Sequence, residues 1–283
     1  ATRGTKKTCF FFAVWRMRLS LPLFLPAAIL APSFRRCLGF AACTMAADMR
    51  PLKTFHNPPA LGKPHASVVF LHGSGDTGDG VQGWAGAVSD PPFVFDNVNV
   101  VFPSAHQRPY SLLGPHGLSS VWFDRSGLGP QAPEDTEGID KMSKLVRQVI
   151  DQEVDKGVPL QKIILGGFSM GGAMAVHAAL GDKELAAELA GVFVLSSFLA
   201  DNSALYQRVR ALKESGSRVP PMLQCHGLSD PMIRPNWGET MSKKLQEAGV
   251  ELEWHTFPNL QHELGTEEMR VLRKWVVGRL GTD

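Results

Sequence analysis

The chain has 283 residues, of which 44% are hydrophobic and 20% are charged, and its formal net charge is +2. This length and composition exclude an intrinsically disordered chain and are typical of a globular protein with a sizeable core. Seven Lys/Arg and no acid fall within residues 1–47, so the remainder carries a net charge of −5 and we expect no nucleic acid among its partners.

The first 50 residues are predicted to lie outside the folded domain, which we place over residues 51–283. They include Leu19–Ala31, an apolar run that two prolines interrupt and that is too short to span a bilayer, so we expect no stable membrane insertion. Two arginines before that run also fit a signal peptide, and the acid-free stretch fits a mitochondrial presequence. Because Met45-Ala46-Ala47 resembles an initiation site, we favour a disordered or non-native extension over a targeting segment.

Cysteine usage indicates a reducing compartment. Three of the four cysteines lie in the first 50 residues, and Cys225 is the remaining one. The sequence has no C-x-x-C pair and no Cys/His spacing typical of a metal site, so we predict neither a disulfide framework nor a bound metal. The expected location is the cytoplasm.

Alternating strand and helix patterns from residue 66 onward predict an α/β fold. Strands are predicted over 67–71, 97–102, 163–165, 190–197, 219–226 and 250–257, the last with a period-two alternation, and helices over 137–156, 173–180, 237–248 and 266–280. This order favours one domain with a mostly parallel central sheet, helices on both faces and no large cap domain. The helix over 137–156 is expected to bury one apolar face, formed by Ile139, Met142, Leu145, Val146, Val149, Ile150 and Val154.

The chain is organised around Gly167–Gly171, a G-x-S-x-G motif between an apolar run and a stretch of good helix formers. A strand, this motif and a helix form the nucleophile elbow of α/β-hydrolases, in which the serine occupies a strained turn that only small flanking residues permit. Ser169 is therefore the candidate nucleophile.

Two backbone N–H groups are candidates for an oxyanion hole. Met170 follows the serine at the start of the predicted helix, where its N–H is free to face a developing negative charge. A second donor comes from the glycine-rich turn that follows the first predicted strand, and by position it is the N–H of Ser74. His72, in the same turn, is expected to hold the loop through a ring hydrogen bond.

The base and the acid are expected after the serine, in the order Ser, acid, His. Of the later histidines, His262 is favoured because it lies in the loop between the last strand and the last helix, whereas His255 falls within an alternating strand. Asp230 is favoured as the acid because it follows the strand next to the one that leads to His262. Asp201, which follows the preceding strand, stays open as an alternative.

These residues predict nucleophilic acyl transfer. His262 would take the proton of Ser169 as its Oγ attacks an acyl carbonyl, and Asp230 would fix the imidazole tautomer. Water activated by the same histidine would then release the acyl group. This chemistry needs no metal and no organic cofactor, and we predict none.

Four motifs in this order resemble the acyl-protein thioesterase/lysophospholipase family of serine α/β-hydrolases, over residues 64 to 280. They are Phe70-Leu71-His72-Gly73-x-Gly75-Asp76-Thr77-Gly78, Trp122-Phe123-Asp124, Gly166-Gly167-Phe168-Ser169-x-Gly171-Gly172 and His226-Gly227-x-x-Asp230. The resemblance implies a mostly cytosolic enzyme that cleaves acyl thioesters or esters, with S-acylated proteins or small acyl esters as substrates. Acyl-protein thioesterases look like G-F-S-Q-G-G at the serine, so Met170 puts the preferred substrate in question.

Residues 104–136 are rich in Pro, Gly and Ser and are predicted as a long loop that covers the site. Leu112, Leu113 and Trp122 are expected to line the substrate pocket, together with Leu118. Because the loop is only modestly apolar, we expect a short or shallow pocket that favours short acyl chains.

Two other hypotheses compete with the prediction of an esterase. A catalytically silent hydrolase fold that serves as a binding module is disfavoured because every triad and oxyanion position is filled. A serine peptidase of the same fold is disfavoured because the chain is too short for the cap or propeller domain that such enzymes usually carry.

Overall fold

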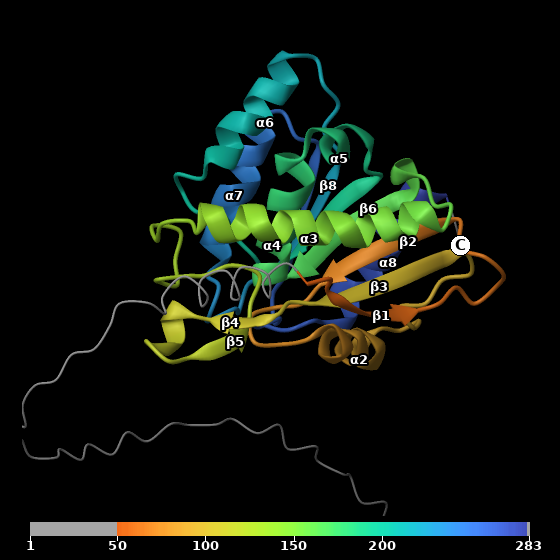
Figure 1. The fold of residues 1–283 in the computed structure, drawn as a ribbon, viewed down its shortest axis with the longest axis horizontal. Helices are drawn as coiled ribbons and strands as arrows, with labels where there is room; N and C mark the ends of the chain where they lie inside the picture. The colour runs from red at the N-terminus through yellow and green to blue at the C-terminus, as the bar shows by residue number, and fades with distance from the viewer. Residues whose placement is uncertain (1–49, 282–283) are drawn as a thin grey trace, which may run out of the picture. The chain divides into compact units, whose positions relative to one another are not determined.

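A seven-stranded sheet runs through the part of the chain that the computed structural model describes, residues 50–281 (Figure 1). Its spatial order is β1-β3-β2-β6-β7-β8-β9, in which β1 is antiparallel to β3 and every other pair is parallel. The strands are β1 (Lys53–Asn57), β2 (Ala66–Leu71), β3 (Val98–Ser104), β6 (Ile163–Phe168), β7 (Gly191–Leu195), β8 (Met222–Gly227) and β9 (Leu252–Phe257). The predicted α/β fold with a mostly parallel sheet is confirmed. The extension predicted over residues 1–50 lies almost wholly outside the described residues.

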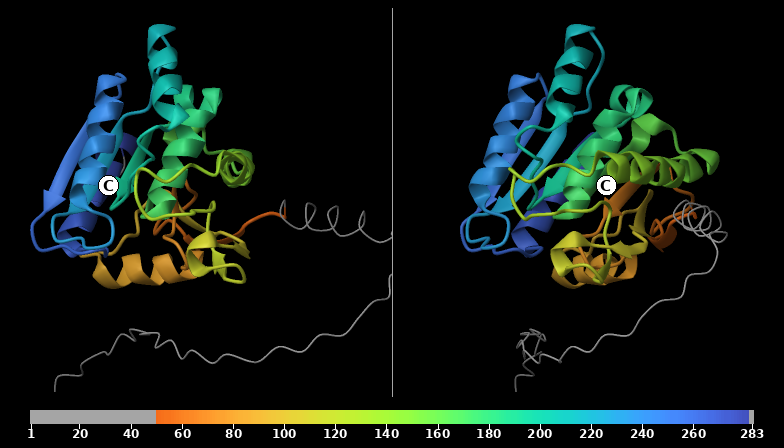
Figure 2. Two further views of the ribbon diagram at one scale, coloured as in Figure 1. Left: turned by 90° about the vertical axis from the view of Figure 1, so that its left-hand side faces the viewer. Right: turned by 60° about the vertical axis from the view of Figure 1, so that its left-hand side comes forward.

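Helices cover both faces of this sheet (Figure 2). One face packs against α3 (Thr136–Asp155), α4 (Met170–Gly181), α6 (Ala204–Glu214) and α7 (Pro235–Glu247), with the short α5 (Lys183–Glu188) beside α4. The other face packs against α2 (Gly78–Val88) and α8 (Thr266–Leu280). Each face has its own apolar core, so strands β2, β6, β7 and β8 are buried at every residue.

Aromatic rings fill the core between the sheet and helices α2 and α8. The ring of Phe70 on β2 lies edge-on to that of Phe193 on β7, with centroids 5.0 Å apart. Between them on β6 is Gly166, where an added Cβ would lie 2.2 Å from the ring of Phe193. A glycine at this position of the central strand therefore lets two large rings on the flanking strands meet.

Helix α2 was not predicted from the sequence, because four of its eleven residues are glycines, which are poor helix formers. Tertiary contacts and a cap stabilise it instead. Thr77 is the N-cap residue, and its Oγ1 accepts a hydrogen bond from the N–H of Gly80 (3.2 Å). Val81 and Ala85 are completely buried against the sheet. The edge strand β1 and the short helices α5 and α6 were also absent from the prediction.

The segment over 104–136, predicted as a loop, contains a small hairpin. Strands β4 (Gln107–Pro109) and β5 (Leu118–Ser120) pair antiparallel, and a 3-10 turn, η1 (Ser111–Leu113), lies between them. The N–H of Gly75 donates to the carbonyl oxygen of Ser120 (2.9 Å), which fixes the hairpin beside the glycine-rich turn that follows β2.

Six of the seven residues predicted to form the buried face of α3 are buried, but Val154 is wrong: it is 37% exposed. Its neighbour Glu153 is buried instead. The carboxylate of Glu153 accepts hydrogen bonds from Ser67 Oγ on β2 (2.6 Å) and Asn99 Nδ2 on β3 (2.8 Å). Burial alone would raise the pKa of Glu153, but bonds from Lys156, Ser67 and Asn99 outweigh it and lower the pKa. Polar side chains on two buried strands thus draw an acid into the position that periodicity assigns to an apolar residue.

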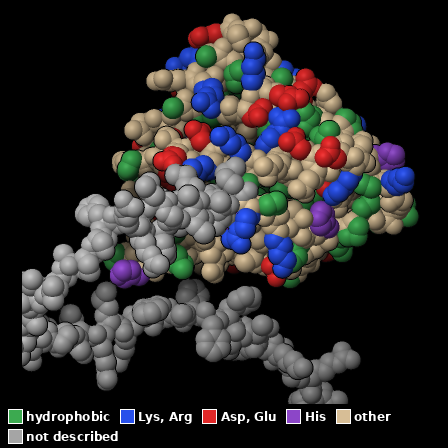
Figure 3. Space-filling model, in the orientation of Figure 1, with side chains coloured by type: hydrophobic (Ala, Val, Ile, Leu, Met, Phe, Trp, Pro, Cys, Tyr) green, Lys and Arg blue, Asp and Glu red, His purple; other side chains and the backbone are tan. Residues whose placement is uncertain are grey.

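Acidic and basic side chains are interspersed over the face of the molecule shown in Figure 3. Arg147 on α3 is one centre of this pattern, since its guanidinium pairs with Asp151, Asp182 and Glu184 at 2.7–3.3 Å. Nucleic-acid-binding domains typically present a basic surface instead. Within residues 50–281, none of the helices has the length and apolar character that crossing a membrane requires.

Candidate active site

Ser169 occupies the tight turn between β6 and α4. Its backbone has φ 54° and ψ −124°, a positive φ that non-glycine residues seldom adopt. The N–H of Ser169 donates to the carbonyl oxygen of Leu195 on β7 (2.8 Å), and its own carbonyl accepts from Gly172 in the first turn of α4 (3.0 Å). Hydrogen bonds to β7 and α4 therefore hold this strained turn in place.

The three side chains predicted as nucleophile, base and acid lie in one hydrogen-bonded row. His262 Nε2 is 3.0 Å from Ser169 Oγ, and His262 Nδ1 is 2.7 Å from Asp230 Oδ2. Ser169 and His262 are 93 positions apart in the sequence, and Asp230 and His262 are 32 apart, so the fold brings the three side chains together. His262 also packs against Phe168, the residue before the serine, with ring centroids 4.8 Å apart.

Asp230 is held in its ionised form by the turn that follows it. The N–H groups of Met232 and Ile233 donate to its Oδ1 at 2.9 and 2.8 Å. Burial would raise the pKa of Asp230, but the hydrogen bond from His262 and these two N–H groups outweigh burial and lower the pKa. A carboxylate only accepts hydrogen bonds, so Nδ1 of His262 carries the proton and Nε2 is left to accept from Ser169.

His226, at the end of β8, supports the turn that carries Asp230. Its Nε2–H donates to the carbonyl oxygen of Ile233 (2.8 Å) and lies 3.7 Å from Asp230 Oδ2. Burial lowers the pKa of His226, which favours the neutral ring. The sequence places this histidine at a strand end and assigns it no role. In the structure, its hydrogen bond to Ile233 stabilises the turn that carries Asp230.

The alternative acid and base lie elsewhere. Asp201 Oδ1 pairs with Lys244 Nζ (3.1 Å), and Asp201 Oδ2 accepts from Gln131 Nε2 (3.1 Å) at the surface. His255 is 42% exposed on β9, where its nearest charged partner is Glu253 at 3.6 Å. Neither side chain is bonded to Ser169 or His262 within the described residues.

The two predicted oxyanion donors face each other from the ends of adjacent strands. Ser74 follows β2 and Met170 follows β6, and their side chains touch through Ser74 Oγ and Met170 Sδ (3.5 Å). Across residues 50–281, no protein acceptor is bonded to the backbone N–H of either residue. Both N–H groups are therefore available to a ligand.

His72 fixes the turn that carries Ser74, as predicted. The N–H of Ala105 donates to its Nε2 (3.0 Å), and its Nδ1–H donates to the carbonyl oxygen of Gly73 (2.7 Å). Burial lowers the pKa of His72 to about 4, so the ring is neutral and can make both bonds at neutral pH.

The structure overturns one predicted pocket residue. Trp122 is completely buried, and its indole N–H donates to the carbonyl oxygen of His72 (2.8 Å), so it supports the turn that carries Ser74. Leu112 and Leu113 are 39% and 58% exposed on η1 of the hairpin, and they stay candidates for contact with substrate. An indole with an N–H partner packs in the core more readily than it lines an open cleft.

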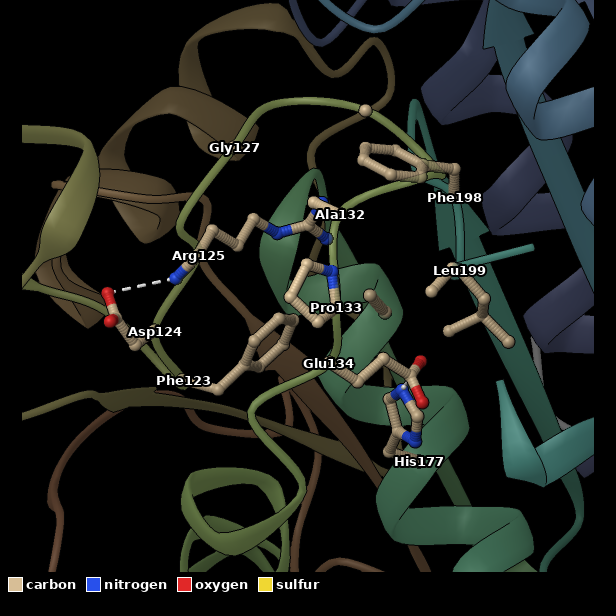
Figure 4. A pocket seen from close by; sticks show the side chains of 13 residues that line it. Phe123, Asp124, Arg125, Gly127, Ala132, Pro133, Glu134, His177, Phe198 and Leu199 are labelled. Carbon is tan, nitrogen blue, oxygen red and sulfur yellow. Dashed lines mark hydrogen bonds and ion pairs between the residues drawn. The ribbon is translucent and has the colours of Figure 1, made fainter. Parts of the chain in front are cut away.

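Two residues near the site were not predicted from the sequence. The hydroxyl of Tyr110, at the start of η1, is hydrogen-bonded to Ser74, and burial raises its pKa above the ordinary value. Arg125 lies in a pocket that opens beside α4 (Figure 4). Tyr110 gave no local signal, whereas Arg125 directly follows the Trp-Phe-Asp motif that the resemblance singled out.

Residues 59–277 match the model of a family described as phospholipase/carboxylesterase. The chain belongs to this family. The predicted resemblance is thereby confirmed, and the chain is a serine hydrolase of the acyl-protein thioesterase and carboxylesterase type. Among the described residues, no group of three or more His, Cys, Asp or Glu side chains is placed to hold a metal ion.

Curated relatives and solved structures support the same assignment. The chain is 41% identical over 219 residues to lysophospholipase-like protein 1 of Mus musculus, covering 77% of this chain and 89% of that protein. It is 34% identical to acyl-protein thioesterase 1 of Gibberella zeae, covering 75% and 89%. The crystal structure of acyl-protein thioesterase 2 of Zea mays superposes with a TM-score of 0.65 at 27% identity, covering 81% of this chain and 99% of that one.

Substituting Gly171→Ala should disable the enzyme, because the new Cβ would lie 2.3 Å from the carbonyl oxygen of Leu71 and 2.4 Å from that of His72. Backbone atoms cannot swing aside, so α4 must shift away from β2. We expect a lower melting temperature and at least a tenfold loss in hydrolysis of a short-chain ester.

Gly83→Ala on α2 is the matched control, since nothing lies within 4 Å of its added Cβ. Alanine at this helical position should be neutral or stabilise by about 0.5–1 kcal/mol. Equal behaviour of the two variants in thermal unfolding and ester hydrolysis would refute the close approach at Gly171.

Proposed function

We propose that the chain hydrolyses acyl thioesters or oxygen esters through an acyl-enzyme formed on Ser169. The observation that carries the proposal is the hydrogen-bonded row in which His262 lies 3.0 Å from Ser169 Oγ and 2.7 Å from Asp230. A serine hydroxyl, an imidazole with its Nδ1 protonated and an ionised carboxylate in this order are what general-base activation of the serine requires.

The reaction would proceed in two halves. Ser169 Oγ attacks the acyl carbonyl carbon while its proton passes to His262 Nε2, and the C–S or C–O bond then breaks as His262 returns that proton to the leaving group. A water molecule attacks the resulting ester carbon, again giving a proton to His262. The carboxylic acid leaves, and the proton returns to Ser169.

Both tetrahedral intermediates would place a negative oxygen between the backbone N–H groups of Ser74 and Met170. These donors are fixed before substrate arrives, because His72 and Trp122 hold one turn and α4 carries the other. Each preorganised donor contributes about 3 kcal/mol to lowering the barrier. The ionised Asp230 stabilises the imidazolium that forms on His262 in the same steps.

S-acylated proteins or small acyl esters are the proposed substrates. Support comes from relatives that are named acyl-protein thioesterases and from the family description, which covers carboxylesterases. A cytoplasmic location is part of the proposal, supported by a reduced, buried Cys225. A catalytically silent binding fold is disfavoured, because it would not need an ionised Asp230 that accepts two backbone N–H bonds and is aligned with His262 and Ser169.

Ser169→Ala tests the proposal most simply. Removal of the hydroxyl should lower kcat/KM for a short-chain thioester by a factor of about 10⁴ or more, because triad members act as a unit. The melting temperature should stay near that of the wild type, since only one atom is lost. Residual activity within tenfold of the wild type would rule out Ser169 as the nucleophile.

Asp230→Asn separates the two candidate acids. The amide can donate to His262 Nδ1 and stabilise the wrong tautomer, so kcat should fall by about 10³–10⁴-fold. Asp201→Asn is the matched control and should change kcat less than threefold, because Asp201 is bonded to Lys244 at the surface. The reverse ranking of the two variants in steady-state kinetics would assign the acid to Asp201.

Acyl-chain preference tests the shape of the binding site. Because Trp122 is withdrawn into the core and Leu112 and Leu113 are exposed, we expect a shallow pocket that favours short chains. Each further methylene that stays in water adds nothing, whereas a buried one would add about 0.8 kcal/mol. We therefore expect kcat/KM to level off before about eight carbons with one leaving group held fixed. A steady rise to sixteen carbons would indicate a deep tunnel.

A further inference from the structure

A pocket opens along α4, the helix that begins directly after Ser169 (Figure 4). One wall is α4, where Ala173 lies one helical turn past the serine and donates its N–H to the carbonyl oxygen of Ser169 (3.4 Å). The opposite wall is the segment over 123–134, and Phe198 closes a third side just after β7. Because four helical residues span about 6 Å, one substrate molecule is long enough to reach both Ser169 and this pocket.

Arg125 extends its guanidinium into this pocket between two aromatic rings. The guanidinium carbon lies 4.3 Å from the ring centroid of Phe198 and 5.2 Å from that of Phe123. These cation–π contacts hold the guanidinium in place between the two rings. A guanidinium carries five N–H donors in one plane, which suits a carboxylate or a phosphate.

No acceptor within residues 50–281 is bonded to the guanidinium of Arg125, even though two carboxylates are close in sequence. The Asp124 carboxylate accepts from the N–H (2.8 Å) and Oγ of Ser111, and Figure 4 shows it turned away from the guanidinium. Glu134 lies 3.2 Å from His177 Nε2 and is also bonded to Ser203. Both acids are thus occupied by other partners.

The charge on Arg125 persists despite its surroundings. Burial lowers the pKa of the guanidinium to about 10, and nearby Tyr110 and Glu134 act in the opposite direction. The group is still a cation at neutral pH. Tyr110 is itself hydrogen-bonded to Ser74, in the turn that follows β2. A half-buried cation with no bonded acceptor in the described residues is well placed to bind an anionic ligand.

We propose that Arg125 is a specificity residue that binds an anionic group, a carboxylate or a phosphate, carried by the substrate that Ser169 attacks. The inference rests on the proposed hydrolase function and deepens it. A planar guanidinium held by two rings can donate two parallel N–H bonds to such a group, which a neutral acyl ester cannot accept in the same way. The Glu134 carboxylate lies 3.2 Å from His177 Nε2, and neither it nor Asp124 is bonded to the guanidinium.

Two pairs of matched substrates test the inference. They also distinguish an anionic group on the acyl side of the substrate from one on the leaving group. On the acyl side, adipoyl and hexanoyl thioesters of N-acetylcysteamine differ only by a terminal carboxylate. On the leaving-group side, the butyryl monoesters of glycerol 3-phosphate and of glycerol differ only by the phosphate. For each pair we would measure the ratio of kcat/KM for the anionic substrate to that for the neutral one, in the wild type, Arg125→Ala and Arg125→Gln.

In at least one pair the ratio should fall tenfold or more in both Arg125 variants, and the pair affected identifies which part of the substrate the pocket holds. Arg273→Ala is the matched control: this arginine also lies over a ring, that of Phe95 at 4.4 Å, but on the opposite face of the sheet, and the ratios should not change.

Unchanged ratios in both pairs, with normal turnover, would overturn the role of Arg125 and leave the proposed hydrolase intact. Absence of turnover and of fluorophosphonate labelling in the wild type would overturn the hydrolase function, and this inference with it. The glutamine variant keeps a polar side chain of similar reach, so a folding defect confined to the alanine variant cannot decide the outcome.

Discussion

The close approach of α4 to the ends of β2 and β6 is the constraint on which the candidate site depends. An added Cβ at Gly167 would lie 2.6 Å from the carbonyl oxygen of Leu71, and one at Gly171 would lie 2.3 Å from it. Only two glycines allow backbone to pack on backbone at this distance. The positive φ of Ser169 follows, because the chain must reverse from strand to helix within one residue while both sides are in contact.

Parallel strands then gather the remaining groups at the same edge of the sheet. Ser74, Ser169, Asp230 and His262 follow β2, β6, β8 and β9, each at the carboxyl end of its strand. Binding groups in open α/β sheets characteristically meet at this edge. Two histidines at the same edge of the sheet hold the turns that carry these groups. His72 anchors the turn of Ser74, and His226 anchors the turn of Asp230. Both are neutral, buried rings whose hydrogen bonds set loop geometry.

The sequence was most informative where a local pattern and a physical demand coincide. The glycines around Ser169 and the positions of Asp230 and His262 after predicted strands could be recognised in the sequence. The structure brings the three side chains together. The sequence was least informative where tertiary contacts override propensity. Helix α2 contains four glycines, and a buried acid at Glu153 displaces Val154 from the face that periodicity predicts.

Residues 104–136 show a second limit of prediction from sequence. Composition indicated a loop and grouped Trp122 with Leu112 and Leu113, but nothing in it could tell that the indole would bond to His72 while the leucines stay exposed. The sequence placed Arg125 directly after the Trp-Phe-Asp motif but could not show its surroundings, which are two aromatic rings and two carboxylates that are bonded to other residues. Such properties depend on partners far away in the sequence.

The location of a covalent adduct is the most direct test of the account. A fluorophosphonate loses fluoride to an activated serine oxygen and stays attached, so digestion and mass spectrometry of the treated protein identify the residue. A Ser169 nucleophile activated by His262 should give one adduct per chain, on Ser169, that disappears in His262→Ala while the His255→Ala variant is still labelled. An adduct on any other residue, or equal labelling of Ser169 when His262 is removed, would contradict it.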